Sequence, residues 1–376
     1  MTSANRQPPT ANRQPTTIIV GPVPPYRAGI AYCTKRLAEE LEAPVLSFKR
    51  QFPRFLYPGG SDVDPTLPPF ENATFLLDIV NPWTWLRGAL SLRRQRPDAV
   101  ILVWWVWVWA LPYLTLLAFL PKRTRVILQC HNIGDKEPAG WKRWLTNRVL
   151  RRGEILVVHA RTEAADALRR VPRARVVTTF LPVHELGGAI PARADARRAL
   201  GLEGNVALFF GHVRPFKGLD IALRAWPLLA TEVTLVVAGE AWWKGEAEYR
   251  HLAKGLERVR FDFRYIPDAE IATYFAAADV VLAPYRIEAQ SGVALTAFHF
   301  ARPVIATTVG GLPEIIEEGA NGMLVPPEDP AGLAAAVDAF FARTDRETMN
   351  GQAAASARKY SWKEYGVLLK RLVAGE

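Results

Sequence analysis

The segment from Glu288 to Pro303 reads EAQSGVALTAFHFARP and lies between two short apolar runs. The run before it, residues 279–283, and the run after it, which begins at Val304, both have the composition of buried strands. Glu288 therefore stands on a loop that follows a strand, and Ser291-Gly292 is typical of a helix start. Because a helix start offers unpaired backbone N–H groups and a partial positive charge, it binds phosphate well. The segment predicts a site that holds a sugar hydroxyl and a diphosphate together.

The composition is that of a two-domain globular protein of 376 residues. Cys33 and Cys130 are the only cysteines, so the sequence predicts no disulfide framework and no cysteine metal site, which suits a reducing cytoplasm. Residues 1–17 are polar and Pro-rich without an apolar signal core, and we expect a disordered lead and no secretion. These features predict a cytoplasmic protein.

The charge is distributed unevenly along the chain. Residues 1–185 hold 26 Lys+Arg and 14 Asp+Glu, whereas residues 186–376 hold 21 and 23. A basic half attracts a polyanion or an anionic membrane surface. An Arg-rich surface that is merely solvated explains the same count, and the sequence leaves both interpretations open.

The uncharged run from Ala99 to Leu120 is long enough to span a bilayer. Its first part is rich in Val, Ile and Trp, which favour strands, and Pro112 stands where a helix can begin. We therefore predict a strand, a helix and a further strand, as in a parallel sheet buried on both faces. Trp107 and Trp109 either belong to the core or lie past the strand end, where they line an acceptor groove or touch lipid headgroups.

The remaining chain alternates apolar runs and helical patterns in two successive series. Strands are expected at residues 17–20, 44–46, 74–79, 99–105, 126–129, 155–158 and 176–179, and then at 206–211, 233–238, 260–265, 280–283, 303–307 and 322–325. Helices are expected at residues 30–41, 218–229, 246–256, 268–277, 330–341 and 362–373. Two such series predict an α/β protein with two Rossmann-like domains that face a central cleft. We divide the chain into a lead (1–16), a first domain (17–185), a second domain (186–355) and a C-terminal helix (356–376).

Candidate binding residues stand in three of the loops that follow predicted strands. Arg214 and Lys217 share one such loop with glycines, and two cations beside an approachable backbone suit a diphosphate. His131 follows the strand at 126–129 and can donate to a sugar hydroxyl, although a single histidine is more often structural. Gly29 precedes a helix and permits the close approach of a phosphate.

Two carboxylate groups are interpreted as structural. Asp62 and Asp64 have the spacing of a metal-binding pair, but they lie among Pro and Gly residues with no strand before them, so we predict a turn. The carboxylates of residues 39–42 fall within one short helical stretch and are expected to be solvated. The sequence has no GxxxxGK[ST] phosphate loop and no module that is typical of nucleic-acid binding.

Taken together, these motifs resemble the retaining GT-B glycosyltransferases of family 4, also called glycosyl transferases group 1. The resemblance covers nearly the whole chain after Thr17. It is carried by residues 211–219 (GHVRPFKGL), 284–285 (PY), 290–293 (QSGV), 303–314 (PVIATTVGGLPE), 131–132 (HN) and 360–362 (YSW).

The resemblance implies a role for each matching residue. Arg214 and Lys217 would bind the donor diphosphate, and Glu288 would contact the donor sugar. The backbone N–H groups of Ser291, Gly292 and Val293 would face the phosphates. Gly29 would lie against the diphosphate, His131 would lie near the transferred sugar, and the last helix would cross back onto the first domain. The family generally needs no metal and no cofactor besides the nucleotide sugar.

The chain departs from the family pattern at three positions. Thr296 occupies the place of a second Glu that binds the ribose in the family, so ribose binding would fall to Thr296, which lacks the carboxylate. His212 stands where Arg is frequent, and Ala28-Gly29 replaces a glycine pair. These changes leave the diphosphate site intact and leave the identity of the donor open.

The sequence thus predicts a cytoplasmic, metal-independent, retaining glycosyltransferase that uses a nucleotide diphosphate sugar. The basic, Trp-rich first half suggests a lipid-linked or polysaccharide acceptor at the inner face of the membrane, without nucleic acid as a partner. A sugar-nucleotide epimerase or hydrolase on the same fold is one alternative. A catalytically silent binding or scaffold protein is the other, because Thr296 lacks the carboxylate.

Overall fold

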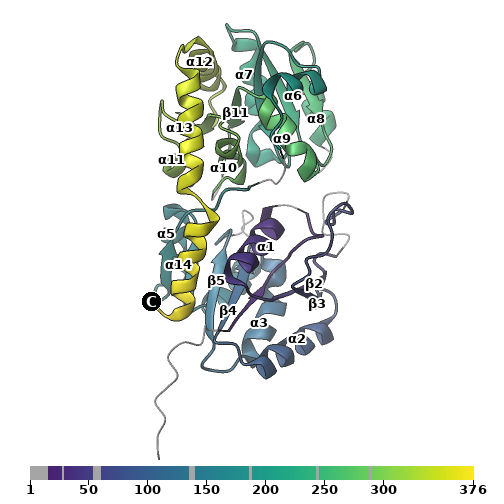
Figure 1. Ribbon diagram of the computed structural model, residues 1–376, viewed down its shortest axis with the longest axis vertical. Coiled ribbons are helices and arrows are strands. Elements are labelled where there is room, and N and C mark those ends of the chain that lie inside the picture. Colours follow the sequence, from purple (N-terminus) through teal and green to yellow (C-terminus); the bar gives the residue numbers. More distant parts are fainter. Residues whose placement is uncertain are drawn as a thin grey trace, which may run out of the picture.

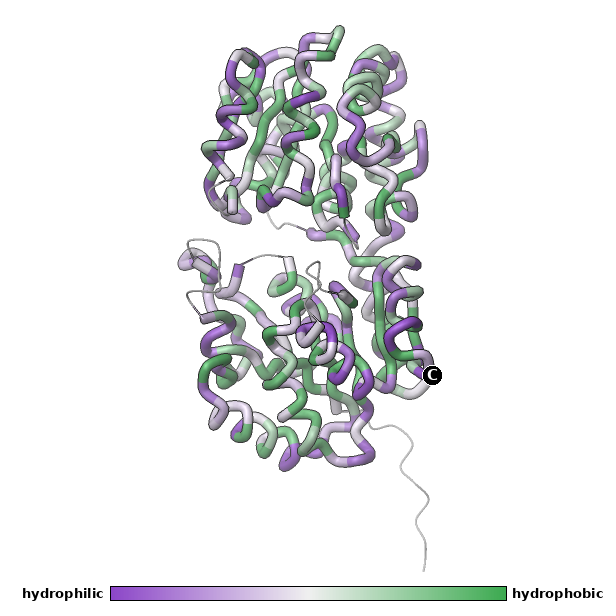
Figure 2. The backbone as a smooth tube through the Cα atoms, turned by 180° about the vertical axis from the view of Figure 1, so that it is seen from behind, coloured by the Kyte–Doolittle hydropathy of each residue, from purple (hydrophilic) through white to green (hydrophobic). Residues whose placement is uncertain are grey.

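The computed structural model describes residues 16–27, 29–53, 61–134, 140–185, 189–242, 245–287 and 290–376. These residues form two α/β lobes stacked along the long axis of the molecule, each built around one parallel sheet (Figure 1). The strands lie at the centre of each lobe and are strongly hydrophobic, whereas the surrounding helices alternate between polar and apolar residues (Figure 2). The fold class predicted from the sequence is confirmed.

The first sheet has seven strands in the order β3-β2-β1-β4-β5-β6-β7. Its strands are β1 (Thr17–Val20), β2 (Val45–Arg50), β3 (Ala73–Asp78), β4 (Ala99–Trp104), β5 (Arg125–Cys130), β6 (Ile155–Val158) and β7 (Arg175–Thr178). The central strand β4 is buried along its whole length because helices cover both faces of the sheet. Its register with β1 pairs Ile101 with Ile19.

One face of the first sheet packs against two helices, α1 (Gly29–Leu41) and α14 (Trp362–Ala374). The other face packs against α2 (Pro82–Gln95), α3 (Ala110–Phe119), α4 (Gly140–Leu150) and α5 (Arg161–Arg170). The short 3-10 turn η2 (Trp107–Trp109) precedes α3.

The uncharged run at residues 99–120 folds into β4, η2 and α3, as the sequence analysis expected. Within the part of the chain that the structure describes, no helix is both long and apolar enough to cross a bilayer. Trp104 and Trp109 are fully buried, and Trp109 packs on Phe48 with ring centres 3.9 Å apart. Trp109 therefore belongs to the core and lines no groove, whereas Trp107 lies past the strand end and is half-buried.

The second sheet has six strands in the order β10-β9-β8-β11-β12-β13. They are β8 (Asn205–Phe210), β9 (Val233–Ala238), β10 (Val259–Asp262), β11 (Val280–Ala283), β12 (Val304–Thr307) and β13 (Gly322–Val325). One face packs against α6 (Arg193–Leu200), α9 (Asp268–Ala277), α10 (Gly292–His299), α11 (Leu312–Ile315) and α13 (Arg346–Lys359). The other face packs against α7 (Leu219–Ala225), α8 (Gly245–Leu252) and α12 (Pro330–Ala342), together with the turn η4 (Trp226–Leu228).

The chain passes between the lobes twice. The first passage runs from β7 to α6, where we retain the proposed boundary near residue 185. The second lies between α13 and α14, so the last helix packs on the first lobe although the helix before it packs on the second (Figure 1). The indole Nε1 of Trp362 donates to the carbonyl of Val183 at 2.9 Å and joins the two passages.

Candidate functional site

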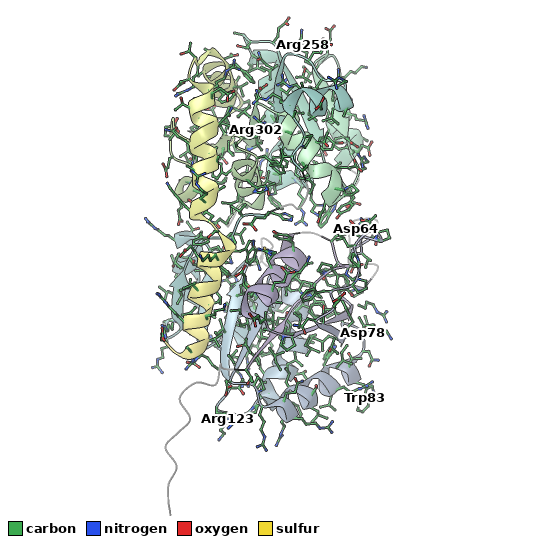
Figure 3. All side chains as sticks on the ribbon, viewed as in Figure 1. Asp64, Asp78, Trp83, Arg123, Arg258 and Arg302 are labelled. Atoms are coloured by element: carbon green, nitrogen blue, oxygen red, sulfur yellow. The ribbon has the colours of Figure 1, made fainter. Side chains whose placement is uncertain are left out.

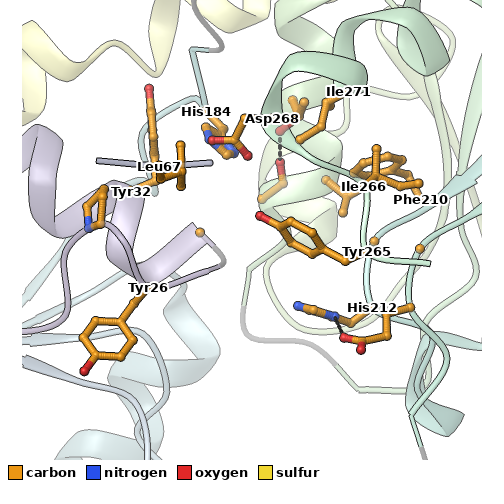
Figure 4. A pocket seen from close by; sticks show the side chains of 18 of the residues that line it. Tyr26, Tyr32, Leu67, His184, Phe210, His212, Tyr265, Ile266, Asp268 and Ile271 are labelled. Carbon is orange, nitrogen blue, oxygen red and sulfur yellow. Dashed lines mark hydrogen bonds and ion pairs between the residues drawn. The ribbon is translucent and has the colours of Figure 1, made fainter. Parts of the chain in front are cut away.

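A cavity of about 930 Å³ lies between the two lobes. Since parallel strands end together at one edge of a sheet, the loops after the carboxyl ends of both sheets meet there. Figure 4 shows Tyr26, Tyr32 and Leu67 of the first lobe facing Tyr265, Ile266 and His212 of the second across an open space. Among the residues that the sequence singled out, Gly29, Arg214, Lys217, Gly292, Val293 and Thr296 line this cavity.

Glycines form the floor of the cavity on the second lobe. Gly211 and Gly239 follow β8 and β9 and both line the cavity. Gly239 has φ +144°, and a Cβ atom there would lie 2.1 Å from the carbonyl oxygen of Gly211. Only glycine allows the two strand ends to approach each other so closely, and a ligand can then lie directly against the backbone.

Two cations stand above this floor, each supported by an aromatic ring. The guanidinium carbon of Arg214 lies 3.7 Å from the centre of the Trp242 ring, and Lys217 Nζ lies 3.8 Å from the centre of the Tyr285 ring. Stacking uses the face of a guanidinium, whereas its N–H donors lie in its plane. The rings therefore fix both cations in positions that line the cavity, as a diphosphate site requires.

His212 lies beside these cations and is neutral at pH 7. Burial, followed by the charges of Arg214 and Lys217, lowers the pKa of His212 to about 4, against the opposing effect of Glu240. Its Nδ1 lies 4.0 Å from a Glu240 carboxylate oxygen, and its ring packs on Trp242 with centres 4.8 Å apart (Figure 4). The cationic charge at this edge therefore belongs to Arg214 and Lys217.

The start of α10 completes the second-lobe side. Ser291 is the N-cap residue, and its buried hydroxyl accepts the N–H of Ala294 at 3.2 Å. Ser291 itself does not line the cavity, but the next two residues, Gly292 and Val293, do. The helix start thus faces the cavity with the partial positive charge of its first turn.

The other predicted residues occupy less direct positions. The Thr296 hydroxyl donates to the carbonyl of Gly292 at 2.8 Å, so its donor is used within the helix. Gly29 begins α1, and a Cβ atom there would meet nothing within 4 Å. Glu288, to which we assign the donor sugar, lies outside the described residues.

His131 stands just behind the cavity. It follows β5, and its neighbour Asn132 lines the cavity. Burial, with a smaller contribution from His159, lowers the pKa of His131 to about 3, so the imidazole is neutral. Its Nε2 atom is buried and has no hydrogen-bond partner in the described part of the chain.

Of the two carboxylate groups interpreted as structural, the stretch at residues 39–42 contains Glu39, which is exposed and pairs with Lys35 and Arg36 but also lines the cavity. Asp64 is buried, and its Oδ1 accepts the N–H and the hydroxyl of Thr66 at 2.8 and 2.6 Å. Burial would raise the pKa of Asp64, but the hydrogen bonds from Thr66 hold it below its usual value. Across the described ranges, no group of three or more His, Cys, Asp or Glu side chains has the arrangement of a metal site.

Sequence reasoning missed several residues that shape the cavity. Tyr265 and Ile266 line it from the loop after β10, Asp268 lines it from the first residue of α9, and His184 lines it from the first passage between the lobes. The guanidinium carbon of Arg27 lies 4.1 Å from the centre of the Tyr265 ring and so joins the lobes at the cavity edge. Tyr265 was missed because it fell inside the strand predicted at residues 260–265, whereas β10 ends at Asp262, and no residue pattern marked His184.

Comparison with known proteins identifies the second lobe. Residues 204–343, which include both cations, match the family model described as Glycosyl transferases group 1. This part of the chain belongs to that family. The family resemblance predicted from the sequence is thereby confirmed.

One curated relative of this chain is the D-inositol 3-phosphate glycosyltransferase of Geodermatophilus obscurus. It is 30% identical over 306 residues, which cover 76% of this chain and 64% of the relative. The chain therefore spans slightly less than two thirds of that protein.

Solved structures establish the fold over nearly the whole chain. Sucrose-phosphate synthase from Thermosynechococcus elongatus aligns with a TM-score of 0.73 and 20% identity, covering 96% of this chain and 98% of that one. HepE of Anabaena, solved in complex with UDP and glucose, aligns with a TM-score of 0.75 and 18% identity, covering 96% and 100%. The chain has the GT-B fold, in which two Rossmann-like domains face a central cleft.

Proposed function

We propose that this protein is a retaining glycosyltransferase that moves a sugar from a nucleotide diphosphate sugar to a hydroxyl acceptor. The observation that carries the proposal is the pair Arg214 and Lys217, held on aromatic rings at the edge of the cavity between the lobes. The HepE complex with UDP and glucose supports a nucleotide-sugar donor on this fold.

The chemistry is a displacement at the anomeric carbon of the donor. The bond between this carbon and the diphosphate oxygen breaks, and the diphosphate leaves with the electron pair. Arg214, Lys217 and the start of α10 stabilise the negative charge that develops on it. The acceptor oxygen attacks from the same face, and the leaving phosphate takes the acceptor proton, so the anomeric configuration is retained. In this scheme Glu288 holds the sugar, and neutral His131 lies behind it without adding charge.

The scheme uses no metal ion and no cofactor. Charge neutralisation comes from a guanidinium, an ammonium and helix N–H groups, which replace the role that a divalent ion plays at other diphosphate sites. Turnover that is unchanged by EDTA is therefore the expected result.

The acceptor class is proposed from the basic, Trp-rich first lobe. A lipid-linked or polysaccharide intermediate at a membrane surface fits that lobe. The relative named a D-inositol 3-phosphate glycosyltransferase makes an inositol phosphate the second acceptor to test.

The first test measures thermal stabilisation by a panel of nucleoside diphosphates and nucleotide sugars. A ligand that binds only the folded state raises the melting temperature, and the base of the strongest hit names the donor class. Arg214→Ala and Lys217→Ala should each weaken that ligand roughly tenfold or more, because each removes a charged hydrogen-bond donor. Arg258→Ala is the matched control, since Figure 3 places Arg258 at the end of the second lobe away from the cleft.

The proposal fails if both cleft variants bind the diphosphate as tightly as the unaltered protein. A second measurement follows labelled donor with and without acceptor. Consumption of donor without acceptor would favour the epimerase or hydrolase, and binding without any turnover would favour the silent scaffold. The configuration of the product, read by NMR, tests retention.

A further inference from the structure

Exposed aromatic side chains gather beside the cleft on the α4 side of the first lobe. Trp141 and Trp144 on the first turn of α4 are 56% and 54% exposed, and Leu111 on α3 is 52% exposed. Trp107 lies against Trp141 with ring centres 4.7 Å apart in an edge-to-face arrangement. We call this surface the α4 face and define it as Trp107, Leu111, Trp141, Lys142, Trp144 and Arg148.

The helical spacing shows that core packing does not explain these residues. Trp141, Trp144 and Arg148 follow one another at i, i+3 and i+7, so they share one stripe of α4. The opposite stripe, with Val149 and Leu150, is the one that packs on the sheet. The helix is therefore apolar on its inner side and aromatic on its outer side.

The surroundings of the tryptophans are positively charged. Arg148 lies 4.6 Å from the centre of the Trp144 ring, and Lys142 Nζ lies 5.1 Å from the centre of the Trp107 ring. Helices α3 and α4 contain three cationic side chains, all on α4, and no Asp or Glu. Asp135 and Glu137, just before α4, lie outside the described residues. Exposed tryptophan beside cationic side chains is the composition of a surface that meets anionic lipid headgroups.

The α4 face lies close to the mouth of the cavity. β4 and β5 end at the sheet edge that faces the second lobe, and Asn132, just after β5, lines the cavity. η2 with α3 follows β4, and α4 follows β5, so the first turns of these helices begin at the same edge. A flat partner that touched Trp141 and Trp144 would reach the entrance through which an acceptor arrives.

We propose that the α4 face docks the protein on an anionic lipid bilayer. Trp141 and Trp144 enter the interfacial region, and Lys142 and Arg148 pair with the headgroups. Only the purpose of docking rests on the proposed function: the docked protein would present a membrane-borne acceptor to the cleft.

The test is flotation with vesicles of phosphatidylglycerol and phosphatidylcholine in equal parts, compared with phosphatidylcholine alone. The protein should float with the anionic vesicles and lose most of this binding in high salt, which screens the cations. Trp141→Ala with Trp144→Ala should weaken binding about tenfold or more, as should Lys142→Glu with Arg148→Glu. Trp83→Ala is the matched control, because Trp83 is 70% exposed but lies on the part of the first lobe away from the second lobe (Figure 3).

Thermal stabilisation by the nucleoside diphosphate, measured on each variant, shows that the variant is folded with its cleft intact. This readout also separates the two proposals, since vesicle binding needs no donor and diphosphate binding needs no vesicle. The inference is overturned if the unaltered protein stays unbound, or if the double tryptophan variant floats as well as Trp83→Ala.

Discussion

At the scale of the residue, Gly218 shows how tightly the loop of Arg214 and Lys217 is built. It follows Lys217 with φ +71°, and a Cβ atom there would lie 1.9 Å from the carbonyl oxygen of Pro284, next to the ring that supports Lys217. Gly218→Ala should therefore lower the free energy of unfolding by roughly 2–4 kcal/mol, because it combines a left-handed backbone with a clash. Urea denaturation measures this change.

Gly29→Ala is the control for this substitution. Gly29 also lines the cavity, but a Cβ atom there meets nothing within 4 Å. Its free energy of unfolding should stay within about 0.5 kcal/mol of the unaltered value. Equal losses in both variants would contradict the role assigned to Gly218.

The same loop shows how far the site could be predicted from the sequence. Arg214 and Lys217 were predicted because two cations and flanking glycines share one loop after a strand. Their supports, Trp242 and Tyr285, come from two other strand ends, and nothing in the spacing of the chain joins them to the cations. A pattern in one sequence reveals candidate binding residues that share a loop. It does not reveal the side chains that other loops bring to that loop in the folded protein.

At the scale of the element, strands were predicted better than helices. The predicted strand at 280–283 coincides with β11, and the one at 126–129 lies within β5, because buried parallel strands read as plain apolar runs. Helices α2, α4, α5, α6 and α13 were not predicted. In α4 the exposed tryptophans obscure the amphipathic period, and α13 is built from small and polar residues. Asn81 followed by Pro82 is typical of a helix start and could have predicted α2.

One buried hydrogen bond links α14 to the first lobe, and removing it tests how much this contact stabilises the fold. Gln129 Nε2 on β5 donates to the Tyr365 hydroxyl on α14 at 2.9 Å, in a region where both side chains are fully buried. Tyr365→Phe leaves the amide without this acceptor and should lower the free energy of unfolding by about 1–3 kcal/mol. Gln129→Leu combined with Tyr365→Phe should recover part of the loss, because neither polar group then remains unpaired. A double variant that is much less stable than Tyr365→Phe would argue against this account.

At the scale of the whole molecule, the lobes are joined by contacts on the α14 side of the cleft. The Glu314 carboxylate of the second lobe accepts the N–H of Arg161 at the start of α5 at 2.8 Å. Gln290, next to the start of α10, accepts the N–H of Leu181 at 2.7 Å. The loop that carries Glu288 is thus bounded by a residue that is fixed to the passage between the lobes. Opening of the cleft would therefore displace residues beside the start of α10, which lines the cavity.

The histidines around this junction predict how stability depends on pH. Burial is the largest cause that lowers the pKa of four of them, to about 3 for His131 and to about 4 for His159, His184 and His212. Their unfolded pKa is near 6.5, so between pH 6.5 and 4 the unfolded chain binds protons that the folded chain refuses. The free energy of unfolding should fall as pH drops through this window, by roughly 1 kcal/mol per histidine at pH 5.5, and should be nearly constant above pH 7. Carboxylates with lowered pKa values act mainly below this window.

Urea denaturation at pH 7.5, 6.5 and 5.5 measures the slope of the free energy of unfolding against pH. His184→Phe, which keeps the ring packed 3.8 Å from Tyr32, should make this slope shallower. Stability that stays constant from pH 7.5 to 5.5 would mean that these imidazoles are protonated in the folded protein, and the neutral histidines assigned to the cleft would have to be abandoned.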